Sequence, residues 1–151
     1  MTFYSNTYPE EGSEIGTQTI TLTVEGPCCE NAYADLVLLW PPNHKWVEIS
    51  IEGVTHTGGE DVTITVTSVW QDEPTEGLGD GDHSPDAVIT DGIVEVRAER
   101  SGIEDGCVYH ISFTATDEYG GYCEGEVTVG VPHDKKDTPV DGGALYDSTL
   151  P

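Results

Sequence analysis

Residues 108–131, VYHISFTATDEYGGYCEGEVTVGV, decide the fold expected for this chain. Apolar and polar side chains alternate on both sides of the central DEYGG, whose acidic and glycine residues are typical of a tight turn. Alternation with a period of two residues is the pattern of a β-strand that buries one face. The stretch therefore predicts two antiparallel strands, 108–116 and 122–131, joined as a hairpin.

The same alternation recurs in five segments nearer the N-terminus, and a two-residue hairpin signal, Asp91-Gly92, separates the last two. The segments are residues 17–24, 46–54, 61–70, 87–90 and 93–100. The side chains expected to face the core are Ile20, Leu22, Val24, Val47, Ile49, Ile51, Val62, Ile64, Val66, Val69, Val94, Val96 and Ala98, with Val69 placed after a shift in the alternation. Residues 30–40, ENAYADLVLLW, leave room for a turn of helix that leads into a further strand.

Short strands at this spacing predict an all-β fold, an antiparallel β-sandwich over residues 17–131. Polar segments flank it, and by composition residues 1–16 and 132–151 are extended tails or linkers. Aromatic residues such as Phe3 and Tyr146 give these tails a means of anchoring on a neighbouring copy, although either tail can instead fold back on its own domain. The length of 151 residues suits one domain.

The charge of the chain excludes several classes of partner. Five Lys and Arg residues against 29 Asp and Glu give a formal net charge of −24. Nucleic acids and anionic membrane surfaces both require clustered positive charge, so neither is an expected partner. The longest apolar run, residues 36–40, is far too short to span a bilayer, and residues 1–14 lack the basic and apolar regions of a signal peptide. Bound cations would relieve the self-repulsion of such a chain, although adaptation to salty surroundings is an alternative reason for the charge.

A calcium site is predicted in the acidic loop QDEPTEGLGDGDHSPDA, residues 71–87. Calcium prefers six to eight oxygen ligands from loops that glycine keeps adaptable. The predicted ligands are Asp72, Glu73, Asp80, Asp82 and Asp86. The loop is not an EF-hand, because Asp91 stands where that motif requires Glu, and no helices flank it. The alternative is a solvated acidic loop without a metal.

A second, weaker metal site is predicted at the opposite end of the sandwich. Strand alternation places the loops that carry Asp61, Asp91 and Asp117 at that end. Three carboxylates from separate loops could hold another calcium ion. The competing interpretation is that each Asp only forms its own turn.

Four cysteines, Cys28, Cys29, Cys107 and Cys123, favour two disulfides and an oxidising compartment. They lack the C-x-x-C spacing of a zinc site, and no basic neighbour would activate a thiol. A bond between the adjacent Cys28 and Cys29 would be strained. Each is therefore expected to reach Cys107 or Cys123, and the sequence leaves both pairings open.

The hairpin at 108–131 resembles the closing hairpin of hyalin-repeat and PKD-like modules. The shared pattern is a Tyr near the strand start, alternation to A-T-D, a glycine turn, and a Cys followed by alternating Val. The resemblance implies an immunoglobulin-like sandwich of about seven to eight strands in a secreted or cell-surface protein. It also implies that Cys28 or Cys29 pairs with Cys123. Cys107 and the doubled cysteine depart from the family pattern and suggest a second, local bridge.

The leading functional hypothesis is an extracellular structural or adhesive module. It is stabilised by calcium and disulfides, and its tails link it to copies of itself or to neighbouring modules in a filament or tandem array. The alternative is a carbohydrate-binding accessory module of a secreted enzyme, because Trp40, Trp46 and Trp70 could stack on sugars if they are exposed. The five histidines are scattered and no catalytic triad has the required geometry, so an enzyme is not expected.

Overall fold

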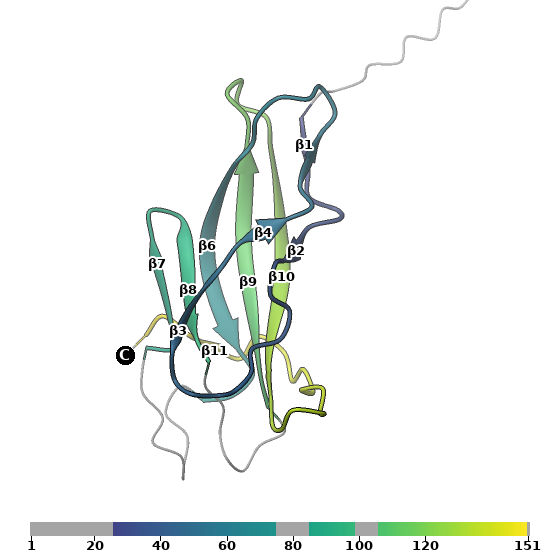
Figure 1. Ribbon diagram of the computed structural model, residues 1–151. Helices are drawn as coiled ribbons and strands as arrows, with labels where there is room; N and C mark the ends of the chain where they lie inside the picture. The colour runs from purple at the N-terminus through teal and green to yellow at the C-terminus, as the bar shows by residue number, and fades with distance from the viewer. Residues whose placement is uncertain (1–25, 75–84, 99–105, 151) are drawn as a thin grey trace, which may run out of the picture.

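The computed structural model describes residues 26–74, 85–98 and 106–150, and these residues form two layers of antiparallel strands (Figure 1). The strands are β1 (Pro27–Cys28), β2 (Tyr33–Ala34), β3 (Trp46–Ile49), β4 (Ile51–Glu52), β5 (Thr55–His56), β6 (Thr63–Gln71), β7 (Ala87–Thr90), β8 (Ile93–Arg97), β9 (Gly106–Thr116), β10 (Tyr122–Pro132) and β11 (Tyr146–Asp147). The predicted all-β sandwich is confirmed. The strand expected at 17–24 lies outside the described residues.

The first layer is a sheet with the strand order β10-β9-β6-β11, and the second contains β3-β8-β7. The pair β2-β4 extends the second layer, because β4 follows β3 directly after Ser50, whose carbonyl accepts a hydrogen bond from the Asp35 N–H. The β9–β10 hairpin predicted from residues 108–131 belongs to the first layer and contains the longest described strands, with 11 residues each. Strands of this length set the long axis of the molecule.

Alternating side chains of the two layers fill the core as the sequence predicts. On β9, Tyr109, Ile111 and Phe113 are buried, and the residues between them face outward. The register of β6 against β9 shifts between Val66 and Ser68, and this bulge returns Val69 to the core. The expected shift at Val69 is therefore confirmed.

Residues 30–40 contain no helix, so the turn of helix that the sequence left room for is not formed. The segment contains β2, and Leu38 then forms a parallel bridge with Gly130 of β10. The Leu39 N–H donates to the Gly130 carbonyl, and the Gly130 N–H donates to the Val37 carbonyl. These hydrogen bonds satisfy backbone groups on the open edge of β10, which a helix could not do. Across the described residues, no helix has the length and apolar character of a membrane span.

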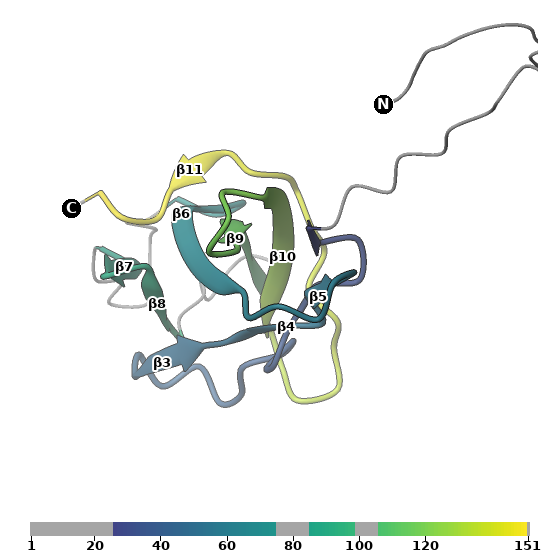
Figure 2. The same cartoon turned by 90° about the horizontal axis from the view of Figure 1, so that it is seen from above.

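Residues 132–150 form a C-terminal strap that folds back on the sandwich, whereas composition predicted a tail or linker. Figure 2 shows the strap passing outside β10, β9 and β6 before β11 joins the edge of β6. Strand β11 pairs with Trp70 and Gln71. The carbonyl of the fully buried Ser148 then accepts hydrogen bonds from the N–H groups of Asp86 and Ala87. The strap thus links the two layers, because β6 belongs to one and β7 to the other.

The elongated sandwich has two distinct ends. We call the end with the β9–β10 turn and the Cys29–Cys123 bond the disulfide pole, which is at the top of Figure 1. We call the opposite end, where β6 and β10 finish and β9 begins, the loop pole. The described chain enters at the disulfide pole, where Gly26 and Thr57 exchange backbone and hydroxyl hydrogen bonds.

Candidate functional site

The described acids of the predicted calcium loop gather at the loop pole, but they have different roles. Asp72 accepts the Val108 N–H on Oδ1 at 2.8 Å and the Gly142 N–H on Oδ2 at 2.9 Å. Both oxygens therefore connect backbone segments, one in β9 and one in the C-terminal strap. Asp80 and Asp82 lie outside the described residues.

Glu73 and Asp86 are buried at the base of the loop beside Gln71. The Gln71 Nε2 group donates to the Glu73 carbonyl at 2.9 Å and to Asp86 Oδ2 at 2.8 Å. The buried Gln71 Oε1 and Ser148 Oγ have no hydrogen-bond partner within the described part of the chain. Two carboxylates and two oxygens without hydrogen bonds suit a hard cation chemically. The described acids nevertheless do not bring three ligand atoms together here.

Cys107 lies within the same acidic environment. Its burial, followed by the negative charges of Glu73, Asp72 and Asp86, raises the pKa of the thiol well above its usual value. A thiol held protonated is a poor nucleophile and a poor metal ligand. The cluster therefore provides no activated cysteine for covalent chemistry.

The second predicted metal site is not assembled by the described residues. Asp91 adopts a positive φ of 53° in the β7–β8 turn, next to Gly92 at 80°, which confirms the hairpin signal. Asp117 is held in the β9–β10 turn, and Asp61 is exposed before β6. The three carboxylates do not form a group with converging ligand atoms. Asp91 and Asp117 instead serve their own turns.

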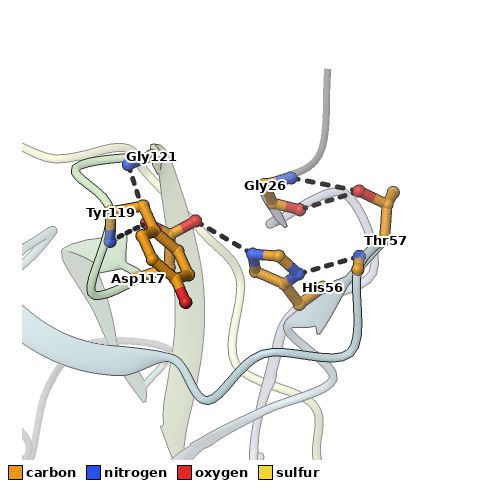
Figure 3. Close-up of polar contacts among 7 residues, drawn as sticks. Gly26, His56, Thr57, Asp117, Tyr119 and Gly121 are labelled. Carbon is orange, nitrogen blue, oxygen red and sulfur yellow. Dashed lines mark hydrogen bonds and ion pairs between the residues drawn. The ribbon is translucent and has the colours of Figure 1, made fainter. Parts of the chain in front are cut away.

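Asp117 is the centre of a buried clamp at the disulfide pole (Figure 3). Its Oδ1 accepts the N–H groups of Tyr119 and Gly121, and its Oδ2 contacts His56 Nε2 at 2.9 Å. The side chains of His56 and Asp117 are each only 3% exposed. The His56 hydrogen bond, followed by the backbone N–H donors of the turn, lowers the pKa of Asp117 despite some opposing desolvation. The clamp joins β5 to the β9–β10 turn.

The hydrogen bonds of His56 fix its tautomer. The Gly58 N–H donates to Nδ1 at 2.9 Å, so that nitrogen carries no proton. The proton therefore lies on Nε2 and is donated to Asp117. In a catalytic triad the nitrogen opposite the carboxylate must face a nucleophile, but here a backbone N–H occupies it. His56 and Asp117 are the residue types of a catalytic dyad, but their hydrogen bonds give the pair a structural role.

His110 bridges β10 and the C-terminal strap on the outer face of β9. Its Nδ1 lies 3.0 Å from Glu126 Oε1, and its Nε2 lies 2.8 Å from Asp141 Oδ1. The ring is 11% exposed. Partial burial opposes protonation, but the bonds to Glu126 and Asp141 outweigh it and raise the pKa of His110. The pKa of Asp141 is lowered, because the His110 and Gly143 hydrogen bonds outweigh its desolvation.

We expect the attachment of the strap to depend on pH. A raised histidine pKa contributes stability below its unfolded value of 6.5, and this contribution is lost as the pH rises through the folded pKa. A lowered aspartate pKa contributes stability above 3.8, which is lost as the pH falls through the folded pKa. Hydrogen-exchange protection factors for Tyr146 and Ser148 should therefore be highest between these values and decline above them. His110→Gln should lower the protection and remove its decline at higher pH, whereas His133→Gln should leave it intact. A wild-type profile that stays flat from pH 6 to 9 would contradict the assignment.

One disulfide is present among the described residues, between Cys29 and Cys123. It matches the pairing implied by the family resemblance. The second disulfide is not formed, because Cys28 and Cys107 are free. Ala115, the register partner of Cys123, and Cys107 are separated by 115 − 107 = 8 residues on β9. A strand segment of this length spans about 26 Å, far beyond the roughly 7 Å that a disulfide bridges. Cys28 adjoins Cys29, which is bonded to Cys123 beside Ala115, so Cys28 lies too far from Cys107 to form the second bond.

A groove that the sequence did not predict lies at the loop pole. It has a volume of about 280 Å³ and is lined by Leu36, Leu38, Leu39, Trp40, Pro41, Asn43, Lys45, Trp46, Val47 and Ala98. Trp40 is 42% exposed and Trp46 is 39% exposed, so both indole rings reach its surface. The Arg97 guanidinium carbon lies 4.3 Å from the Trp46 ring centroid. Two of the three tryptophans considered for sugar binding thus share one site, whereas Trp70 lies apart on β6.

Family models, curated proteins and solved structures give no match to this chain. The assignment of function therefore depends on the geometry of the sites above.

Sequence reasoning also missed His133, Asp134 and Asp137, whose ligand atoms lie within 4.8 Å of one another at the start of the strap. The Lys136 N–H, the first of several donors, holds the pKa of Asp134 below its usual range. The spacing H-D-x-x-D in residues 133–137 could have drawn attention to the group. His133 is partly exposed and both carboxylates are exposed, and the neighbouring Lys135 and Lys136 offset their charge.

Proposed function

We propose that the protein is an extracellular structural and adhesive module that works in series with other modules or with copies of itself. One observation carries this proposal: the Cys29–Cys123 bond provides a covalent route along the outside of the sandwich. From Gly26 the chain reaches Cys29, crosses to Cys123, and continues along β10 to the loop pole. Tension between the two poles would follow this route along the edge strand β10, and the loop that the disulfide closes would not be extended.

The polar residues at both poles support a structural role. Asp72, Asp117 and His110 each join segments that are distant in sequence. Both ring nitrogens of His56 are occupied by its clamp partners, and both of His110 contact carboxylates, so neither imidazole is available as a general base. Side chains held in this way resist shear between the elements that they join.

The force route gives a direct test with optical tweezers. With handles attached at Gly26 and Leu150, the oxidised protein should lengthen mainly by release of the C-terminal strap. The loop between Cys29 and Cys123, which have a sequence separation of 94, should stay closed. In reductant, or in Cys29→Ser/Cys123→Ser, unfolding should add roughly 300 Å, because an extended residue spans about 3.3–3.6 Å. The same released length in oxidised and reduced protein would mean that the disulfide does not carry the tension. Cys28→Ser is the matched control and should behave like the wild type.

Calcium at the loop pole belongs to the same proposal. Glu73 and Asp86 are described at the base of the loop, and Asp80 and Asp82 would supply the remaining carboxylates. Bound calcium would reduce repulsion among these acids and fix the loop against the sandwich, because a ligand held only by the folded state stabilises it by mass action.

Removing the metal should therefore lower the melting temperature. We expect chelator to shift thermal unfolding downward by several degrees, which corresponds to about 1–3 kcal/mol. Asp80→Asn/Asp82→Asn should show the lower value even in calcium. Glu60→Gln/Glu118→Gln removes the same charge from exposed positions and should keep the calcium response. Superimposable melting curves in calcium and in chelator would remove calcium from the proposal.

A further inference from the structure

The groove of Leu36, Leu38, Trp40, Lys45 and Trp46 has the surface of a docking site. Leu36 and Leu38 are exposed alongside the two indole rings, so apolar side chains line the segment between β2 and β3. Exposed apolar residues that adjoin in this way mark interaction sites more often than isolated ones do. These exposed apolar side chains mark the groove as a surface for a binding partner.

Its charge contrasts with that of the rest of the protein. The chain has only five Lys and Arg residues at a net charge of −24, yet Lys45 lines the groove and Arg97 stacks on Trp46. At physiological ionic strength, charges farther away than about 8 Å are largely screened, and Lys45 is the charged residue among those that line the groove. The groove thus favours a segment that combines aromatic side chains with carboxylates.

The N-terminal sequence has this composition. Residues 2–14, TFYSNTYPEEGSE, contain three aromatic residues followed by three glutamates. The aromatic residues are Phe3, Tyr4 and Tyr8, and the acids are Glu10, Glu11 and Glu14. The other candidate, the C-terminal strap, is already used, because β11 pairs with β6 of its own domain. The N-terminal segment is the remaining candidate of the two.

The positions of segment and groove favour docking between copies. The segment precedes Gly26, which lies at the disulfide pole, whereas the groove lies at the loop pole beside Ala98 and Gly130. The 25 residues before Gly26 can extend at most about 90 Å, enough to reach the facing pole of a copy stacked end to end. Docking on the same chain would instead require the segment to run back along the whole sandwich.

We propose that the groove binds residues 2–14 of a second copy, with aromatic side chains against Trp40 and Trp46 and glutamates beside Lys45. The contact is heterologous, so repetition builds an open head-to-tail chain of modules. The inference rests on the proposed assembly in series and adds its partner and site. The tweezers experiment uses a single tethered domain, so its result does not depend on this contact.

The test uses a labelled peptide of residues 2–14 and a full-length protein in which Phe3, Tyr4 and Tyr8 are replaced by serine, so that its own segment cannot compete. We expect saturable binding that Trp40→Ala and Lys45→Glu each weaken at least tenfold. Trp70→Ala is the matched control, because Trp70 is similarly exposed at 37% but lies on β6. A Glu10→Lys/Glu11→Lys peptide should recover binding to the Lys45→Glu protein. If Trp40→Ala does not fold, Lys45→Glu and its charge-reversed peptide still decide the result.

The unmodified chain should increase in weight-average mass with concentration in sedimentation equilibrium, and the triple serine protein should not. Four results would overturn the proposal. The peptide could bind no better than a scrambled peptide, or binding could be insensitive to both groove variants. The unmodified chain could remain monomeric while the peptide binds only the triple serine protein, which would place the segment on its own domain. Neutral oligosaccharides could bind in a Trp40-dependent way while the peptide does not, which would assign the groove to glycans.

Discussion

Replacing both Cys29 and Cys123 with serine should lower the free energy of unfolding by about 4–5 kcal/mol. The bond closes a loop with a sequence separation of 94 residues, and in the chain-entropy model a loop of that length removes this much conformational freedom from the unfolded state. Since small domains are stable by only about 5–15 kcal/mol, the change is a large share of the total. The melting temperature should fall by roughly 15 °C.

The matched control for this prediction is Cys28→Ser. Cys28 is the adjacent residue and is free and only partly buried, so its replacement should change stability by less than about 1 kcal/mol. Urea denaturation of the three proteins measures the difference directly. Equal stability of the double variant and the wild type would mean that the bond is absent in solution, and intact-mass measurement with and without reductant would then show four free thiols.

Gly106→Ala should lower the free energy of unfolding by about 2–4 kcal/mol through the C-terminal strap. Gly106 has a φ of +109°, which an alanine adopts only at a cost. A Cβ at this position would lie 2.8 Å from both the Val131 carbonyl oxygen and the Pro139 Cβ. Because Val131 belongs to β10, the strand cannot retreat without breaking its ladder, so Pro139 and the strap must move.

Gly143→Ala separates the two causes. Its φ of +103° is similar, but no atom lies within 4 Å of the added Cβ. The substitution should cost only the backbone strain, roughly 1–2 kcal/mol. Urea midpoints report both losses, and hydrogen exchange at Ser148 should show that Gly106→Ala loosens the strap. Equal losses for the two variants would mean that Pro139 does not pack against Gly106.

The two layers could be predicted from the sequence because their signal is local. A strand that buries one face must alternate apolar and polar residues, so the alternation itself predicts that Val94 and Val96 face the core, whichever strands they pack against. The Asp91-Gly92 turn is equally local, since few residues other than glycine tolerate the positive φ that it requires. Even the bulge before Val69 was visible, as a break in the alternation.

The candidate sites could be predicted only in part, because the role of a carboxylate depends on what surrounds it. Glu73 and Asp86 meet near Cys107, as their proximity in sequence suggested. Asp72 and Asp117 are acids of the same kind, but they hold backbone N–H groups that only the folded chain brings to them. The groove of Trp40 and Trp46 escaped prediction because its walls close only when residues 36–40 pack beside β3.

The sequence by itself determined that this chain is an antiparallel sandwich with a net charge of −24. The tertiary structure alone decided what the strap and the cysteines do. The strap is mostly polar, and only contacts with distant residues such as Gln71 and Asp72 make it part of the domain. Cys28 and Cys29 are equivalent by composition, yet successive side chains on an extended chain point in opposite directions. Only Cys29 can therefore face Cys123, and which neighbour faces inward depends on the docking of β1 and the residues after it.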